Sequence, residues 1–594
     1  MPVQRSSNVF SIEVDGSPLS QDLIGALLEA FVEDEINLPD AFELVFRDPM
    51  RTVIQTGGFA IGKPVKIKVV SEASPEGLAI LDGEITALEA SVERDRTLTI
   101  VRGYDQGHRL QRGTVTETHL DMTYGDIASK VAERRGIAKG ETGSNTVVHE
   151  AVVQWNQTDW EFLSKLAAEI GHEVVVLEGK LHLREPTNSA DAPEGGDLNS
   201  EEARQLVAGR NLLHLRAVVS GAEQVEEVQV RGWDFKAKEA IEGSAKAADS
   251  ARSAAAGQGA ADLAKKLGGG TLVRPDLSVA SEEVARNAAE SLVEQLGSAA
   301  AELEGVVFGN PALRAGVSIS VSNVGEPFDG KYVLTSCRHT YEPENGYLTS
   351  FRVSGRQTRT MLGLVKGKHE GTAGRVGGVV PALVSNVDDP ESLGRVKVSF
   401  PWLAEKAESF WARVALPGAG PERGFTVLPE VGDEVLVGFD HGDTRTPYII
   451  GGLWNGKDKL PVTPVENGEI VTRAWVSRKG HKVELHDKDD AITIATGDGK
   501  HRIVLDQKNS KILIETSGDV EVTSDKTMAV KAPNGITMES SSGEVVLKGN
   551  GVTIDAGAGS FSAKGVSSKV EGSGSAELSS SGQTTVRGSM VMVN

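Results

Sequence analysis

The feature that most constrains the fold of this chain is a repeat of short apolar strands from about residue 480 to residue 594. In most steps the first apolar residue of a unit recurs after seven to nine residues. A second apolar residue follows two positions later, which is the spacing of a strand with one buried face. The nine pairs that form the candidate core are Val483 and Leu485, Ile492 and Ile494, Ile503 and Leu505, Ile512 and Ile514, Val520 and Val522, Met528 and Val530, Ile536 and Met538, Val545 and Leu547, and Val552 and Ile554.

A repeat this regular indicates one structural unit stacked many times, and no single unit buries its own apolar face. An eight-residue unit supplies one strand and one corner, so three chains close a triangular core at every level. We interpret the repeat as a homotrimeric, intertwined β-helix, or β-prism. With strands stacked about 4.8 Å apart, some thirteen units would build a needle on the order of 60 Å long. A single-chain β-solenoid stays open as an alternative on the pattern alone.

Composition excludes several classes of function. The formal net charge of -22 disfavours nucleic acid and anionic membranes as partners, because both attract basic surfaces. The one cysteine, Cys337, excludes an internal disulfide and a site with several thiolates. The first residues lack the basic and apolar segments of a signal peptide, and no apolar run approaches the roughly 20 residues of a membrane helix. We therefore expect no signal peptide and no stable membrane insertion.

The residues before the repeat predict a mainly β fold with minor α content. Residues 1–115 alternate as in an antiparallel β-barrel, with Phe42, Leu44 and Phe46 on one face of a strand. Residues 116–235 continue with strands and two helices. In the second of these helices Thr158 and Glu161 have the spacing of a capping box.

Residues 236–275 are rich in Ala, Ser, Lys and Gly, which is typical of a mobile insertion or a weak helix. A further helix is predicted from Ser281, with Val284, Ala288, Leu292 and Leu296 in register as its apolar stripe and Gly297 after them. The segments 332–342 and 346–355 read as a hairpin.

A linker at residues 367–379 precedes five short strands in residues 380–458, which suits an OB-type barrel. Such barrels often bind single-stranded nucleic acid through a basic groove with stacking aromatics. Here the surface is acidic, so we discount that function. The acidic residues are Glu405, Glu408, Glu422, Glu430, Asp433 and Glu434.

At these residues the chain resembles VgrG-type (valine-glycine repeat) spike proteins of type VI secretion and other contractile injection systems, and is similar to the hub-plus-spike of contractile phage tails. The resemblance spans nearly the whole chain and rests on the order of its motifs, followed directly by the octad repeat. The motifs are GYDQGHRLQRG at 103–113, NQTDWEFLSKLAAEIG at 156–171, GRVKVSFPW at 394–402, PEVGDEVLVGF at 429–439 and HGDTRTPYIIGGLWN at 441–455.

The resemblance implies a homotrimer that forms a structural hub and a membrane-puncturing spike. Two similar barrels in each chain would match a hexameric inner tube of Hcp-like protein to a three-fold needle. Baseplate proteins and effectors are further implied partners, and the particle would assemble in the bacterial cytoplasm and be expelled on contraction. The choice between phage, secretion system and free injection particle stays open. The expected parts are hub barrel 1–115, second hub segment 116–235, insertion 236–275, barrel completion 276–366, linker 367–379, OB-fold neck 380–458, connector 459–479 and needle with tip 480–594.

The last residues of the chain are expected to bind a tip protein. The residues concerned are Met590, Val591, Met592, Val593 and Asn594. Three copies of this apolar segment would leave a platform in water that proteins rarely tolerate without a partner. The resemblance implies that a conical PAAR-repeat protein covers it.

We predict no catalytic residue, no cofactor and no metal site. The loop GAGPERG at 418–424 lacks the Gly-Lys-Ser/Thr ending of a phosphate loop and is expected to be a β-turn. His441 and Asp443 have no serine nucleophile motif nearby, and His339 is expected to pack in a core. A metal at His481, His486, Asp487, Asp489 and Asp490 was weighed against a solvated corner, which is favoured. The alternatives from other classes are a trimeric phage tail fibre or adhesin, and a tail spike that degrades cell wall or polysaccharide.

Overall fold

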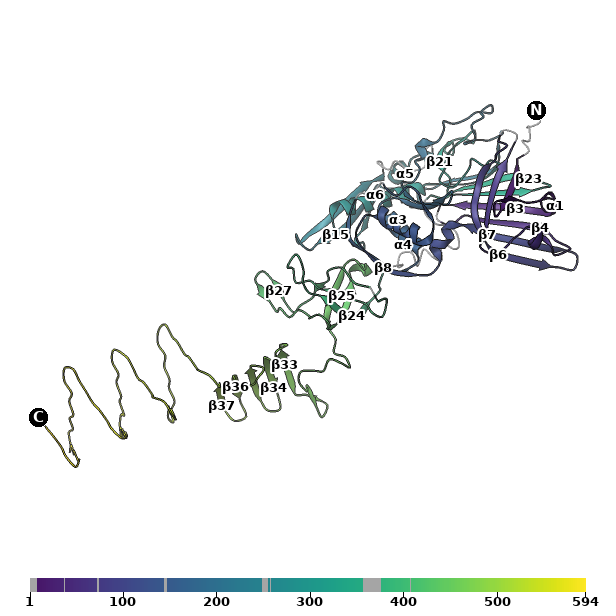
Figure 1. The fold of residues 1–594 in the computed structure, drawn as a ribbon. Coiled ribbons are helices and arrows are strands. Elements are labelled where there is room, and N and C mark those ends of the chain that lie inside the picture. The colour runs from purple at the N-terminus through teal and green to yellow at the C-terminus, as the bar shows by residue number, and fades with distance from the viewer. Residues whose placement is uncertain are drawn as a thin grey trace. The chain divides into compact units, whose positions relative to one another are not determined.

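The computed structural model describes residues 8–36, 38–71, 74–143, 147–247, 255–256, 258–355, 375–405 and 407–593. The chain divides into two compact units, Met1–Leu460 and Pro461–Asn594. Strands dominate both the element order and Figure 1, and the helices are few and short, so the predicted mainly β fold class is confirmed. Most of the linker expected at 367–379 lies outside the described residues.

The largest element of the first unit is one curled sheet of eleven strands. Its order is β14-β19-β23-β22-β3-β4-β7-β6-β5-β1-β2, so strands from both ends of the unit share it. The bounds are β1 Val9–Val14, β2 Ser17–Pro18, β3 Leu27–Glu35, β4 Ala41–Arg47, β5 Pro64–Val70, β6 Leu78–Val92, β7 Thr97–Asp105, β14 Leu212–Val219, β19 Ala301–Phe308, β22 Ser336–Glu342 and β23 Gly346–Val353.

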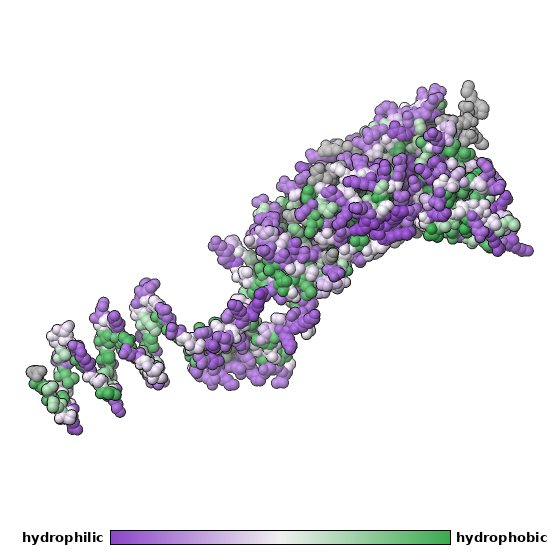
Figure 2. All heavy atoms as spheres, viewed as in Figure 1, coloured by the Kyte–Doolittle hydropathy of each residue, from purple (hydrophilic) through white to green (hydrophobic). Residues whose placement is uncertain are grey.

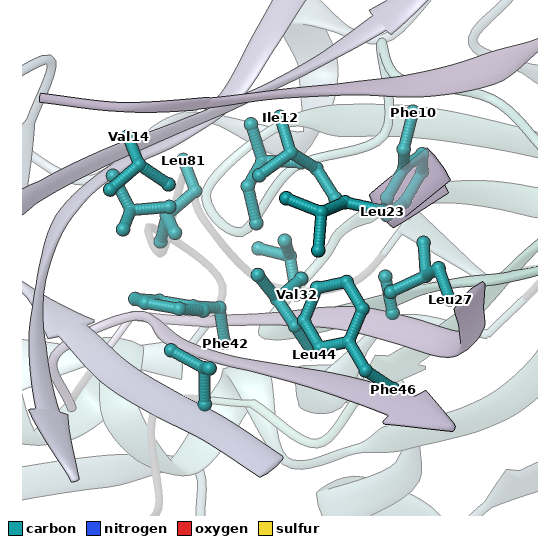
Figure 3. Packing of buried hydrophobic residues seen from close by; sticks show 14 of the residues in the cluster. Phe10, Ile12, Val14, Leu23, Leu27, Val32, Phe42, Leu44, Phe46 and Leu81 are labelled. Atoms are coloured by element: carbon teal, nitrogen blue, oxygen red, sulfur yellow. The ribbon is translucent and has the colours of Figure 1, made fainter. Parts of the chain in front are cut away.

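The N-terminal half of this sheet curls around an apolar core. In β4 every second residue is buried, which places Phe42, Leu44 and Phe46 inside as predicted. Figure 3 shows these side chains pointing toward Ile12 and Leu81 from strands on the other side of the core. Two short helices, α1 Gln21–Ala26 and α2 Val53–Thr56, are the helical elements of this half.

The two halves of the sheet join where β22 pairs with β3. Their antiparallel register runs from Ser336 opposite Glu35 to Tyr341 opposite Ala30. The neighbouring pair, β22 and β23, forms the predicted hairpin. The barrels are therefore one hydrogen-bonded body, which the separate strand-rich blocks of the sequence did not indicate.

Two capped helices follow the first half of the sheet. Helix α3 (Tyr124–Arg135) ends at Gly136 in a left-handed conformation, and α4 (Asp159–Glu169) begins with the predicted capping box of Thr158 and Glu161. Strands and turns around them are β8 Val115–Met122, β9 Ala138–Lys139, β10 His149–Gln157, β11 Glu173–Leu177, β12 Lys180–Arg184, and the 3-10 turns η1 Gln106–Gln111 and η2 Ser189–Asp191. We call residues 115–298, apart from β14 of the large sheet, the middle segment.

Residues 236–275, expected to be a mobile insertion or a weak helix, contain the strands Glu239–Lys246 and Thr271–Arg274, which corrects that expectation, and a short helix at Ala260–Lys266, which agrees with it. A three-stranded sheet has the order β16-β15-β18 and packs on helix α6. Ala and Gly serve this contact, because a Cβ on Gly243 would fall on the backbone of Ala285 and Arg286. The bounds are β15 Glu227–Asp234, β16 Glu239–Lys246, β17 Ala255–Ala256, α5 Ala260–Lys266, β18 Thr271–Arg274 and α6 Glu282–Ser298.

Helix α6 also corrects the predicted stripe. Its buried face carries Ala285, Ala289, Val293 and Gly297, one position on from the predicted apolar residues, which are only partly buried. The helix includes Gly297 and runs to Ser298. Small side chains occupy the buried face because β16 lies so close to the helix that larger ones would not fit. A further sheet combines β13 Gln205–Val207, β20 Ser318–Ser322, β21 Gly330–Val333 and β17.

A five-stranded barrel closes the first unit, in the order β25-β24-β29-β30-β26. Its core contains Val384, Val398, Phe400 and Val437. The loop at 418–424 is the predicted turn, a hairpin of β27 and β28. The bounds are β24 Val379–Asn386, β25 Lys397–Ser399, β26 Arg413–Val414, β27 Ala419–Gly420, β28 Arg423–Gly424, β29 Glu434–Phe439, η4 Asp440–Gly442 and β30 Pro447–Gly452. We call this barrel the neck.

The second unit begins as an antiparallel meander, β33 to β37, preceded by a small hairpin. Beyond Glu515 the described residues of this unit contain no helix or strand, and Figure 1 shows the chain running back and forth. The units expected at 520–554 thus form no strand pairs within one chain. The bounds are β31 Val465–Glu466, β32 Glu469–Ile470, β33 Thr472–Val476, β34 Lys482–His486, β35 Ala491–Ala495, β36 Arg502–Asp506 and β37 Lys511–Glu515.

Candidate functional site: needle face, barrel seam and neck joint

The register of the meander gathers eight predicted core residues in two rows on one face. Residues directly opposite each other in a sheet point to the same side. One row is Val483, Ile494, Ile503 and Ile514, and the other is Leu485, Ile492, Leu505 and Ile512. We call this surface the needle face.

The needle face is open to water in the single chain. Ile492 is 39% exposed and Ile512 is 70% exposed, and the ten predicted core residues beyond β37 are 51–67% exposed. Figure 2 shows hydrophobic residues recurring along this whole stretch. A contiguous apolar surface of this kind marks a place where another surface binds.

The opposite face of the meander carries charged side chains together with the apolar pair Val504 and Leu513. Lys482 and Glu484 form an ion pair of 2.6 Å, and Arg502 pairs with Glu515 at 2.7 Å across two strands. The meander therefore has one apolar face and one mixed face with several charged side chains, and the apolar face is left uncovered in the single chain.

The proposed tip residues are also exposed. Met590 is 77% exposed, Met592 is 80% exposed and Val593 is 90% exposed. Asn594 lies outside the described residues.

The histidines at the base of the second unit brace turns. His481 Nδ1 accepts a hydrogen bond of 3.1 Å from the Gly497 amide, and His486 Nδ1 accepts one of 3.1 Å from the Asp489 amide. Asp487 is paired with Arg473 at 2.5 Å. Within the described part of the chain, no group of three or more His, Cys, Asp or Glu side chains is placed to hold a metal ion.

A buried charge cluster, which we call the barrel seam, joins the two halves of the eleven-stranded sheet. Arg314, from the loop after β19, pairs with Asp34 of β3 and lies 3.2 Å from Asp40. A third buried carboxyl, Asp105 at the end of β7, accepts a 2.9 Å hydrogen bond from the Gly107 amide.

The seam gathers three buried carboxyl groups around one guanidinium group. Burial raises the pKa of Asp105 to about 7, and the nearby charge of Asp34 adds to the shift. Burial also raises the pKa of Asp40, with Asp34 as the next cause. The seam is thus charge-balanced only when it holds protons.

His339 and Cys337 lie beside the seam. His339 is fully buried, as its expected packing role requires, and its Nδ1 lies 2.6 Å from the Tyr347 hydroxyl. Burial lowers the pKa of His339 to about 4 and raises the pKa of Cys337, so both are neutral at pH 7.

Two side chains cross between the middle segment and the neck in opposite directions. Trp155 of β10 packs against the neck core, with its ring centroid 4.8 Å from that of Phe400 and 5.6 Å from that of Phe439. Arg445, from the loop before β30, reaches back into the middle segment. We call this pair of contacts the neck joint.

Arg445 sits in a network of four side chains. Its guanidinium donates to Glu169 of α4 at 2.9 Å and to Asp443 at 2.6 Å. The Tyr124 hydroxyl of α3 donates to the same Glu169 carboxylate at 2.5 Å. Asp443 is therefore an ion-pair partner of Arg445, and His441 lies on an exposed turn.

A third contact braces the joint from the β15–β16 turn. Lys236 forms an ion pair of 2.6 Å with Glu391 of the neck, and the Arg413 guanidinium lies 4.8 Å from the Phe235 ring centroid. These residues belong to the stretch around the predicted insertion. Neither this brace nor Arg445 was foreseen, because single exposed-looking charges carry no pairing signal in a sequence.

Two family comparisons match this chain. Residues 380–454, the neck, match the type VI secretion system and phage-baseplate injector OB domain, which confirms the predicted OB fold. Residues 7–343, more than half of the chain, match the family described as the Alg8 N-terminal domain.

Curated relatives carry VgrG names. The chain is 31% identical over 160 residues to the actin cross-linking toxin VgrG1 of Vibrio cholerae, and 32% identical over 146 residues to the type VI secretion system spike protein VgrG3 of the same species. These matches cover 26% and 24% of this chain, and 14% of each relative's own length.

Solved structures share the fold. The Francisella PdpA-VgrG complex, lidded, aligns with a TM-score of 0.50 at 8% identity, covering 86% of this chain and 81% of that one. The lidless PdpA-VgrG complex aligns with the same TM-score and identity over 100% of its chain. In the described residues no helix is long and apolar enough to cross a membrane.

The curled sheet and the OB barrel give the first unit a fold like that of phage tail hub and spike proteins. Over residues 7–343 the chain belongs to the family described as the Alg8 N-terminal domain, and it is similar to VgrG-type spike proteins over about a quarter of its length. The name of that family describes a domain and no activity.

We call the part of the first unit that precedes the neck, up to residue 355, the hub. The barrel seam predicts that the free energy of unfolding of the hub falls as the pH rises. The folded-state pKa of Asp105 is raised from 3.8 to about 7, so its stabilisation is complete below about pH 4 and is lost as the pH rises through about 7. One pKa unit corresponds to about 1.4 kcal/mol. We therefore expect the free energy of unfolding of the hub to fall by about 2–4 kcal/mol between pH 5 and pH 8.

Chemical denaturation of the full chain at several pH values measures this slope. Asp105→Asn keeps an acceptor for the Gly107 amide and removes the titrating group, so the slope should flatten. Exposed Asp95→Asn is the matched control and should keep the wild-type slope. An unchanged slope in the Asp105 variant would contradict the assignment.

Proposed function

We propose that this protein is the structural hub and membrane-puncturing spike at the tip of a contractile injection machine of the type VI secretion kind. Three copies would adapt a hexameric inner tube to a three-fold needle. The observation that carries the proposal is the needle face, whose two apolar rows have no covering surface in the single chain.

Three chains offer a cover that one chain lacks. Beyond Glu515 the described backbone forms no ladder with its own neighbours, so its strand hydrogen bonds need other chains. A trimer would pair these strands and turn the needle faces of three chains toward one axis. A single-chain solenoid is disfavoured, because its successive units would stack and pair with each other within one chain.

The proposed mechanism is mechanical. Burial of apolar area contributes roughly 25 cal/mol for each Å², and a trimer would accumulate it over every level of the needle. Opening one level would require opening its neighbours, so the needle should unfold slowly under axial load. We propose no enzymatic activity for this chain.

The proposed partners follow from this role. They are an Hcp-like inner tube protein, baseplate proteins, effectors and a PAAR-repeat protein at Met590–Asn594. The particle would assemble in the bacterial cytoplasm and be expelled on contraction. The tail-fibre, adhesin and polysaccharide-degrading alternatives have no observation in their favour.

The needle face gives a test of the trimer. Replacing Ile512 and Ile514 with Asp would place six charges on the axis of a trimer, where desolvation is costly. Sedimentation should show that this variant is monomeric. The matched control replaces Lys511 and Leu513 with Asp. Both residues lie in the same strand on the opposite face, so this variant should remain trimeric. Intact trimers in the first variant would refute the interior assignment.

The tip gives a second test. Removing residues 590–594 deletes the exposed apolar segment and leaves the candidate core untouched. Trimers should persist, and binding of a PAAR-repeat protein in a pull-down should fall at least tenfold. Undiminished binding would contradict the proposed tip site.

A further inference from the structure

The neck is held by contacts from several places in the middle segment. Besides Trp155, Tyr124 and Glu169, the Thr118 hydroxyl of β8 donates to the Glu408 carbonyl at 3.1 Å. Ser278 and Thr446 hydroxyls lie 3.1 Å apart. In Figure 1 β8, α3 and α4 lie between the large sheet and the neck strands β24 and β25. The middle segment is therefore the part that links the large sheet to the neck.

We propose that Trp155 and Arg445 form a reciprocal joint that fixes the neck on the hub, so that force on the hub reaches the neck through these side chains. The mechanical meaning of this joint rests on the proposed function. Its existence does not, because the contacts lie within one chain.

The two contacts resist different movements. The ring of Trp155 is surrounded by neck aromatics, including Trp402 at 6.1 Å, so sliding the neck sideways would pull an aromatic side chain out of an apolar core. Arg445 is oriented by a carboxylate on each side of the interface. Tilting the neck would separate Arg445 from Glu169 while Asp443 moves with it, because Asp443 belongs to the neck.

Moving the Arg445 guanidinium group away from Glu169 is unfavourable at neutral pH. Asp443 is only 7% exposed, and the Arg445 charge beside it holds the pKa of its carboxyl well below the usual range. Lys165 also faces Asp443, and burial lowers its pKa; His149 stacks on Tyr124 and has a pKa lowered by burial. Loss of Arg445 leaves buried carboxylates without their guanidinium partner, which destabilises strongly.

The brace at Lys236 and Glu391 adds a third point of support. Three contacts that do not share a residue define the orientation of a rigid body, whereas one contact would act as a hinge. This gives the segment around residues 227–298 a function within the fold: it carries the turn that touches the neck.

Hydrogen exchange on the full chain tests the joint. We expect Arg445→Met and Trp155→Ala to speed amide exchange at least tenfold in both α4 and the loop 440–446, while the large sheet keeps its protection. Arg423→Met and Trp454→Ala change an exposed arginine and an exposed tryptophan of the neck and serve as matched controls with wild-type exchange. Arg445→Lys keeps the positive charge but lacks the planar guanidinium group. Its amide exchange rates should lie between those of the wild type and those of Arg445→Met.

Electron microscopy of the same variants supplies the orientation itself. The angle between neck and hub should be single-valued in the wild type and broadly distributed in Arg445→Met. Wild-type exchange and a single angle in both joint variants would overturn the proposal. Loosened joints with undiminished secretion would remove the force-bearing role. A monomeric wild type would overturn the proposed function while leaving the joint measurable.

Discussion

The structure depends on one constraint: the needle face has no cover within its own chain. Eight apolar side chains lie in two rows on the meander, and the stretch that follows repeats the pattern without forming strands of its own. Apolar surface is brought out of water at roughly 25 cal/mol per Å², so a surface of this extent drives association. We call the other compact unit, Met1–Leu460, the platform.

The platform is held together by buried charges as much as by apolar packing. Arg314 links the two halves of the large sheet, and Arg445 links the middle segment to the neck. A buried ion pair contributes little net stability, but breaking one by removing a partner is costly. Such ion pairs therefore fix the relative arrangement of the parts that they join, because they favour one arrangement over similar ones.

Local patterns in the sequence predicted local structure well. Alternation in Phe42, Leu44 and Phe46, and the capping box at Thr158, depend on neighbours within a few residues, and the structure confirms both. The pairing of β22 with β3 spans 300 residues and has no local signal. The buried face of α6 lies one position after the predicted apolar stripe. The nearby strand β16 admits only small side chains there, so side-chain size and not hydrophobicity decides which face is buried. The neck joint was missed for the same reason as the seam: isolated charges reveal their partners only in space.

The central claim is that three chains close the needle. Electron microscopy of the purified full chain tests it most directly. The account predicts particles with a three-fold base and a thin, straight rod, and a mass in solution of three times 62.8 kDa. Single particles of 62.8 kDa whose C-terminal part is a solenoid or has no fixed form would contradict it.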